Sequence, residues 1–128
     1  MSETCLFDYA VFRLVPRVER EEFFNVGVIL SCPNFKFLEA KVFLDEAKLR
    51  CFAPAIDIED VRHFLDIIPK ICAGGTSYEG VIGSLTQRER FYWLSAQRST
   101  IIQSSPIHTG LTSDPSSTLE RLFQKNVK

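Results

Sequence analysis

The sequence lacks an excess of charge of either sign. Fifteen lysines and arginines stand against 16 aspartates and glutamates, and the formal net charge is −1. Domains that bind nucleic acid or anionic membranes through their overall charge are strongly basic, so this balance does not indicate either partner. Any site for an anion must therefore be a local cluster of basic side chains.

Long apolar runs and closely spaced cysteines are also missing. No run approaches the length of about 18 apolar residues that a membrane span requires. The start, Met-Ser-Glu-Thr-Cys-Leu-Phe-Asp, has neither the basic nor the apolar part of a signal peptide. The four cysteines form no C-x-x-C pair, which favours buried, reduced thiols over a zinc site. We therefore expect a cytoplasmic protein without a metal ion or other cofactor.

Known catalytic motifs are equally absent from the chain. There is no P-loop, no dinucleotide glycine fingerprint, no H-E-x-x-H and no G-x-S-x-G. The two histidines, His63 and His108, have no acid or nucleophile near them in sequence that would indicate a catalytic pair. The sequence leaves open whether the protein is an enzyme.

The composition is that of a single globular domain covering residues 1–128, with 45% hydrophobic and 24% charged residues. Residues 6–15 alternate between two apolar faces, which predicts a strand covered on both sides and ended by Pro16. Further strands are predicted over 25–31, 35–44 and 100–104. Short connections favour antiparallel pairing of the early strands.

Helices are predicted from capping residues and apolar spacing. Asp45 and Asp57 are expected to cap helices over 46–52 and from 58 onward, with Pro69 kinking or ending the second. A capping box at Ser84 and Gln87 predicts a helix over 88–94, although a strand at Arg90–Leu94 stays open. Asp114 is expected to cap the last helix. Residues 17–24 are expected to form one or two helical turns, and 106–113 a loop. The predicted fold is α+β: a mostly antiparallel sheet of about four strands, with three to four helices packed on it.

Arginines are concentrated between the first two predicted strands. Arg13, Arg17 and Arg20 can converge on one point if the chain turns after Arg13, and arginine forks bind phosphate or carboxylate. The alternative is internal pairing with the glutamates of the same run, which would fix the turn. A second group, Arg98 with Thr100, suits a phosphate or an ordinary strand end equally well. The two groups meet if the late strand lies beside the first.

Carboxylate and amide side chains close to these arginines allow two further interpretations. Glu21 and Asn25 are four residues apart and, with Glu22, offer oxygen ligands for a divalent cation; a solvated face with Asn25 as a cap is favoured. Gly27 indicates a bulge or a close approach to the backbone. The candidate anion- or partner-binding residues are Arg13, Arg17, Arg20, Glu21, Asn25, Arg98 and Thr100.

One pattern, Tyr9-x-x-x-Arg13-x-Val15-Pro16-x-x-x-Arg20-Glu21-Glu22-Phe23-x-Asn25-Val26-Gly27, resembles the hallmark of a bacterial family called domain of unknown function 3037. Later matches include Trp93-Leu94 and Asp114-Pro115. The resemblance implies a gene neighbour similar to HipA-type kinases, and so a protein partner that is a HipA-like kinase.

These observations lead to a ranked set of functions. The first is a binding or regulatory module for a protein partner. The alternative is an enzyme or ligand binder that recognises a phosphorylated or nucleic-acid substrate through the arginine cluster. A third possibility is that the charged run has a purely structural role. The oligomeric state is not indicated.

Overall fold

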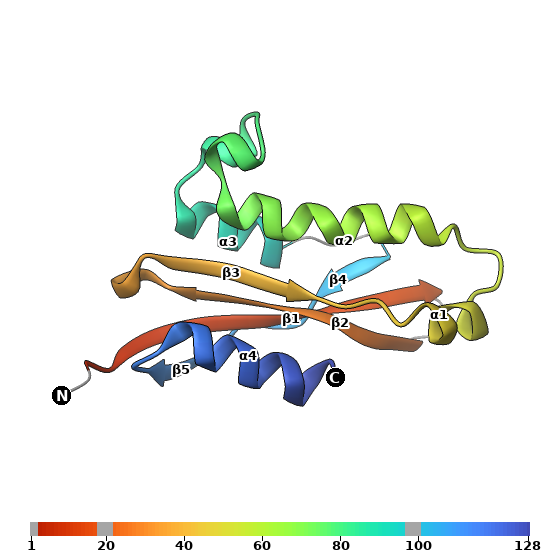
Figure 1. Cartoon of the computed structure of the whole chain (residues 1–128), viewed down its shortest axis with the longest axis horizontal. Coiled ribbons are helices and arrows are strands. Elements are labelled where there is room, and N and C mark those ends of the chain that lie inside the picture. The colour runs from red at the N-terminus through yellow and green to blue at the C-terminus, as the bar shows by residue number, and fades with distance from the viewer. Residues whose placement is uncertain (1–2, 18–21, 97–100) are drawn as a thin grey trace.

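A five-stranded antiparallel sheet forms the centre of the protein in a computed structural model, which describes residues 3–17, 22–96 and 101–128 (Figure 1). Its strands are β1 (Cys5–Arg17), β2 (Glu22–Cys32), β3 (Phe37–Val42), β4 (Ile102–Ser104) and β5 (His108–Thr112). The order is β3-β2-β1-β4, and β5 also pairs with β1. The α+β class predicted from the sequence is confirmed.

Helices cover both faces of this sheet. They are α1 (Glu46–Phe52), α2 (Ile58–Ala73), α3 (Gln87–Ser95) and α4 (Pro115–Asn126); short 3-10 turns span Pro33–Phe35, Gly75–Ser77 and Ile82–Ser84. Figure 1 shows α2 and α3 on one face and α4 on the other. A large apolar core includes Phe12, Leu14, Val26, Leu65 and Phe91, and a smaller one includes Phe7, Val11, Val28, Leu119 and Leu122.

Strand β1 contributes to both cores because its side chains alternate. Ala10, Phe12 and Leu14 belong to the core under α2 and α3, whereas Tyr9 and Val11 belong to the core under α4. This confirms the prediction of a strand whose two faces are covered. The apolar stripe of the last helix likewise packs on its own sheet.

The boundary between the first two strands differs from the prediction. Pro16 does not end β1, which continues to Arg17, and Glu22–Phe24 are in β2 rather than in a helix. The register shifts between Leu14 and Arg17, so Pro16 lies at a bulge, where a missing N–H costs no ladder bond. Residues 18–21 lie outside the described part of the chain.

The structure also decides two details of the predicted helices. Helix α2 runs through Pro69, and buried residues on both sides of the proline, including Leu65 and Ile71, attach it to the core. The capping box of α3 is formed by Thr86 and Glu89, not by Ser84 and Gln87. Residues Arg90–Leu94 are helical.

The predicted loop over 106–113 contains a strand, β5. Strands β4 and β5 follow each other along the same edge of β1, with a break at Ser105 and Pro106. The backbone N–H of Ser105 donates to the Val11 carbonyl at 2.8 Å, and the Ser105 hydroxyl accepts from the Val11 N–H at 2.9 Å. Ser105 therefore continues the ladder across a break whose composition is typical of a turn.

We expect Ser105→Ala to lower the free energy of unfolding by about 1–3 kcal/mol, because it leaves the buried Val11 N–H without its acceptor. Ser104→Ala is the matched control. Its half-buried hydroxyl donates only to the Ser105 carbonyl, so its loss should cost no more than about 1 kcal/mol. Urea unfolding of both variants measures the difference. Equal losses would show that the Ser105 hydroxyl has no special role in the ladder.

Candidate functional site

The ends of three strands meet at one corner of the sheet. Arg13 in β1 lies directly opposite Asn25 in β2 and Gln103 in β4. Residues directly opposite in an antiparallel pair share a face, so these three side chains form a row across the sheet. The late strand therefore does lie beside the first, which was the condition for the two arginine regions to approach each other.

The row lies beside the C-terminal end of α4. The Asn25 side chain donates from Nδ2 to the Asn126 carbonyl at 2.9 Å, and Asn126 donates from its own Nδ2 to the Leu122 carbonyl at 2.9 Å. Carbonyls in the last turn of a helix lack intrahelical partners, and Asn25 satisfies one of them. Asn25 thus joins β2 to α4.

Arg13 is half-buried within this row. Its guanidinium carbon lies 4.6 Å from the centre of the Phe23 ring, which is a cation–π contact. Its Nε is buried and has no hydrogen-bond partner among the described residues. The guanidinium therefore lies over the Phe23 ring, while its Nε has no acceptor among the described residues.

The other predicted site residues are placed only in part. The backbone of Arg17 ends β1 opposite Glu22, and the Val15 N–H donates to the Ile101 carbonyl at 2.6 Å. The backbone of Ile101 therefore lies beside the end of β1. Four predicted site residues lie outside the described part of the chain: Arg20, Glu21, Arg98 and Thr100.

A polar network at the other end of β1 was not predicted. Arg88 of α3 donates to the Ser31 hydroxyl, to an Asp8 carboxylate oxygen and to the Tyr92 hydroxyl, each at 2.8 Å. The Thr109 hydroxyl donates to the second Asp8 oxygen at 2.7 Å. This network joins α3 to three strands, and it lies at the base of a surface groove of about 500 Å³.

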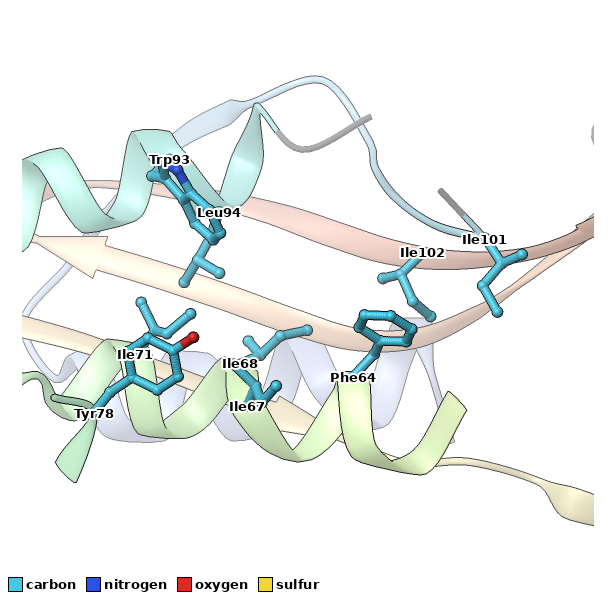
Figure 2. Close-up of a pocket in the computed structure, with 9 residues that line it drawn as sticks. All are labelled: Phe64, Ile67, Ile68, Ile71, Tyr78, Trp93, Leu94, Ile101 and Ile102. Atoms are coloured by element: carbon cyan, nitrogen blue, oxygen red, sulfur yellow. The ribbon is translucent and has the colours of Figure 1, made fainter. Parts of the chain in front are cut away.

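An apolar cleft opens on the face that α2 and α3 cover. It has a volume of about 160 Å³ and is lined by Phe64, Ile67, Ile68, Ile71, Tyr78, Trp93, Leu94, Ile101 and Ile102. Figure 2 shows the α2 side chains on one side and Trp93 with Leu94 across from them. Two rim residues stay accessible, since Phe64 is 49% and Trp93 40% exposed.

Sequence reasoning missed this cleft, although one signal of it was present. Phe64 and Ile67 add apolar surface to α2 beyond its buried stripe, which includes Leu65 and Ile68. A helix that only docks on its own sheet needs a single stripe. The second stripe indicates a further apolar contact.

Among the described residues, the interior contains three thiols and one arginine. Burial raises the pKa of the Cys72 thiol to about 12. Cys5, Cys32 and Cys72 are buried free thiols, while Cys51 is exposed. Arg90 is buried and donates to the Cys72 carbonyl at 3.2 Å. Across residues 3–17, 22–96 and 101–128, no group of three or more metal-ligating side chains is present.

The fold and its cleft define a small α+β domain with an apolar site between two helices and a sheet edge. The chain belongs to the family described as protein of unknown function (DUF3037), which it matches over residues 9–127. No curated protein and no solved structure matches it. In the described residues, no helix is both long and apolar enough to cross a membrane.

We expect Arg88→Met to lower the free energy of unfolding by about 1–3 kcal/mol, because Asp8 and the buried Ser31 each lose a charged donor. Arg50→Met is the control, since Arg50 forms only an exposed pair with Glu46 at 3.7 Å. Such surface pairs contribute about 0–1 kcal/mol. Thermal or urea unfolding measures both. A loss for Arg88→Met no larger than that for Arg50→Met would contradict a structural role for the network.

Proposed function

We propose that this protein is a binding module for a protein partner. The observation that carries the proposal is the apolar cleft between α2, α3 and β4, with the accessible rings of Phe64 and Trp93 at its rim. Exposed aromatic side chains around a pocket are typical of the central residues of protein interfaces. The eleven phenylalanines of the chain are consistent with a fold that leaves such a surface.

The size of the cleft favours a protein over a small molecule. Sites for cofactors and drug-sized ligands enclose about 300–1,000 Å³. A cleft of about 160 Å³ accommodates roughly one large apolar side chain. We therefore infer that a partner inserts one leucine-sized or phenylalanine-sized side chain, and that Phe64 and Trp93 flank it.

The candidate partner is the HipA-like kinase that the family resemblance implies. Its binding segment should present an apolar side chain with further apolar surface beside it, to cover the two rim aromatics. Because the cleft has few polar groups, affinity would come mainly from burial of apolar surface. The protein has a regulatory role if formation of the complex changes the activity of the kinase.

Trp93 provides a direct test because it is the only tryptophan in the chain. We expect its emission to shift to shorter wavelength when the purified HipA-like kinase is added, since binding in the cleft removes the indole from water. We also expect Phe64→Ala to weaken the complex by about tenfold or more, as measured by titration calorimetry.

Phe43→Ala is the matched control for Phe64→Ala. Phe43 is also a partly exposed phenylalanine, at 40%, but it does not line the cleft. Its loss should leave the affinity within about twofold. A complex that forms without a change in Trp93 emission would place the interface elsewhere, and no complex at all would remove the kinase as partner.

An anion site at the Arg13 corner is the second candidate function. The observation that favours it is the Nε of Arg13, which has no hydrogen-bond partner among the described residues. A phosphorylated or nucleic-acid substrate would supply the acceptor oxygens. The stacked guanidinium is already oriented, so little side-chain entropy is lost on binding.

Pyrophosphate is a suitable probe of this corner. We expect Arg13→Gln to weaken its binding by about tenfold or more, because a charged bidentate donor is lost. Arg50→Gln, which removes an exposed arginine on α1, should have no effect. Titration calorimetry measures both. Equal affinities for the two variants would exclude Arg13 as an anion ligand.

A further inference from the structure

The two edges of the sheet differ in their protection. Strand β3 forms one edge and carries Glu39 and Lys41, both exposed, with Lys41 paired to Glu120 of α4. Charged side chains on an edge strand, lysine above all, oppose the addition of another strand. Strand β5, with the sequence His-Thr-Gly-Leu-Thr, contains no lysine, arginine, aspartate, glutamate or proline.

Strand β5 is also the less covered of the two edges. Leu111 of β5 lies directly opposite Leu6 of β1, and these leucines are 65% and 63% exposed. They share a face with Ala10 and Phe12, which α2 and α3 cover farther along β1. The main helix contacts are made to β2, β3 and β4, so the helical layers cover the β5 end of the sheet less.

We propose that β5 pairs with β5 of a second copy of this chain, so that two five-stranded sheets join into one. A two-fold axis perpendicular to the sheet relates the copies, and such an axis makes the two β5 strands antiparallel. The main-chain groups on the outer side of β5 then gain partners, as they do when any strand is added to an open edge.

A second copy fits this edge better than an unrelated segment because the surface is complementary to itself. Neither strand carries a lysine, arginine, aspartate or glutamate, so no such like charges meet where the two strands pair. With the axis at Gly110, Thr109 of each copy faces Leu111 of the other, and the two Leu111 side chains become diagonal neighbours. Diagonal neighbours in a sheet are close enough for large apolar side chains to touch. Each copy thus contributes its exposed leucine pair to one apolar patch across the axis.

Sedimentation equilibrium of the full chain tests the proposal. We expect a mass of twice 14.6 kDa at high concentration. Leu111→Lys should weaken association by about 100-fold or more, because two lysines would meet across the axis. The control is Val81→Lys, which places the same charge at an exposed apolar residue away from β5. Circular dichroism checks that each variant is folded, and Leu6→Lys replaces Leu111→Lys if that variant is not.

Hydrogen exchange of the unmodified protein gives an independent measurement. The amides of His108–Thr112 should exchange more slowly as the protein concentration rises, whereas those of Phe37–Val42 should not change. A mass of 14.6 kDa at every concentration overturns the proposal. So does a dimer that Leu111→Lys leaves intact, because its interface would lie away from β5. Slower exchange in β3 instead of β5 would show that the copies pair through β3, and it would also overturn the proposal.

Discussion

The rest of the structure depends on one constraint: strand β1 is buried on both faces and paired along both edges. This strand of 13 residues pairs with β2 along one edge and with β4 and β5 along the other. Phe12 and Leu14 require a cover on one face, and Phe7 and Val11 require one on the other. Helices α2 and α3 supply the first cover and α4 the second, so the three layers follow from a single alternating strand.

Irregularities in the ladders of β1 determine where the polar row of Arg13, Asn25 and Gln103 lies. Gly27 lies beside a bulge, where the register of β2 against β1 shifts by one residue. A Cβ at Gly27 would lie 2.9 Å from the Lys41 carbonyl oxygen. A glycine is therefore required where β2 passes close to β3. The same bulge directs Asn25 to the face of α4, beside Arg13. A bulge re-aims side chains at a sheet end, and here it builds the polar row.

The sequence predicted the structure best where the conformation of a residue depends on its near neighbours in the chain. Alternation in β1 and the caps Asp45, Asp57 and Asp114 predicted strand faces and helix starts that the structure confirms. Local patterns were insufficient where distant residues decide the structure. Strand β5 is recruited by β1 although Ser105 and Pro106 resemble a turn, and α2 passes Pro69 because the core holds both of its halves.

The same division applies to the candidate sites. Arg13 and Asn25 were identified because they lie in one dense local run, and the structure places them side by side. The network of Arg88 and the apolar cleft join segments that are up to 101 residues apart, so no local pattern contains them. The sheet also separates the apolar cleft from the row of Arg13. The cleft lies on the face of α2 and α3, and the row lies on the face of α4. No described side chain lines both, but Ile102 of the cleft and Gln103 of the row are consecutive residues of β4, so a ligand in one would act on the other through β4. Substitutions of residues that are not in contact should have nearly additive effects.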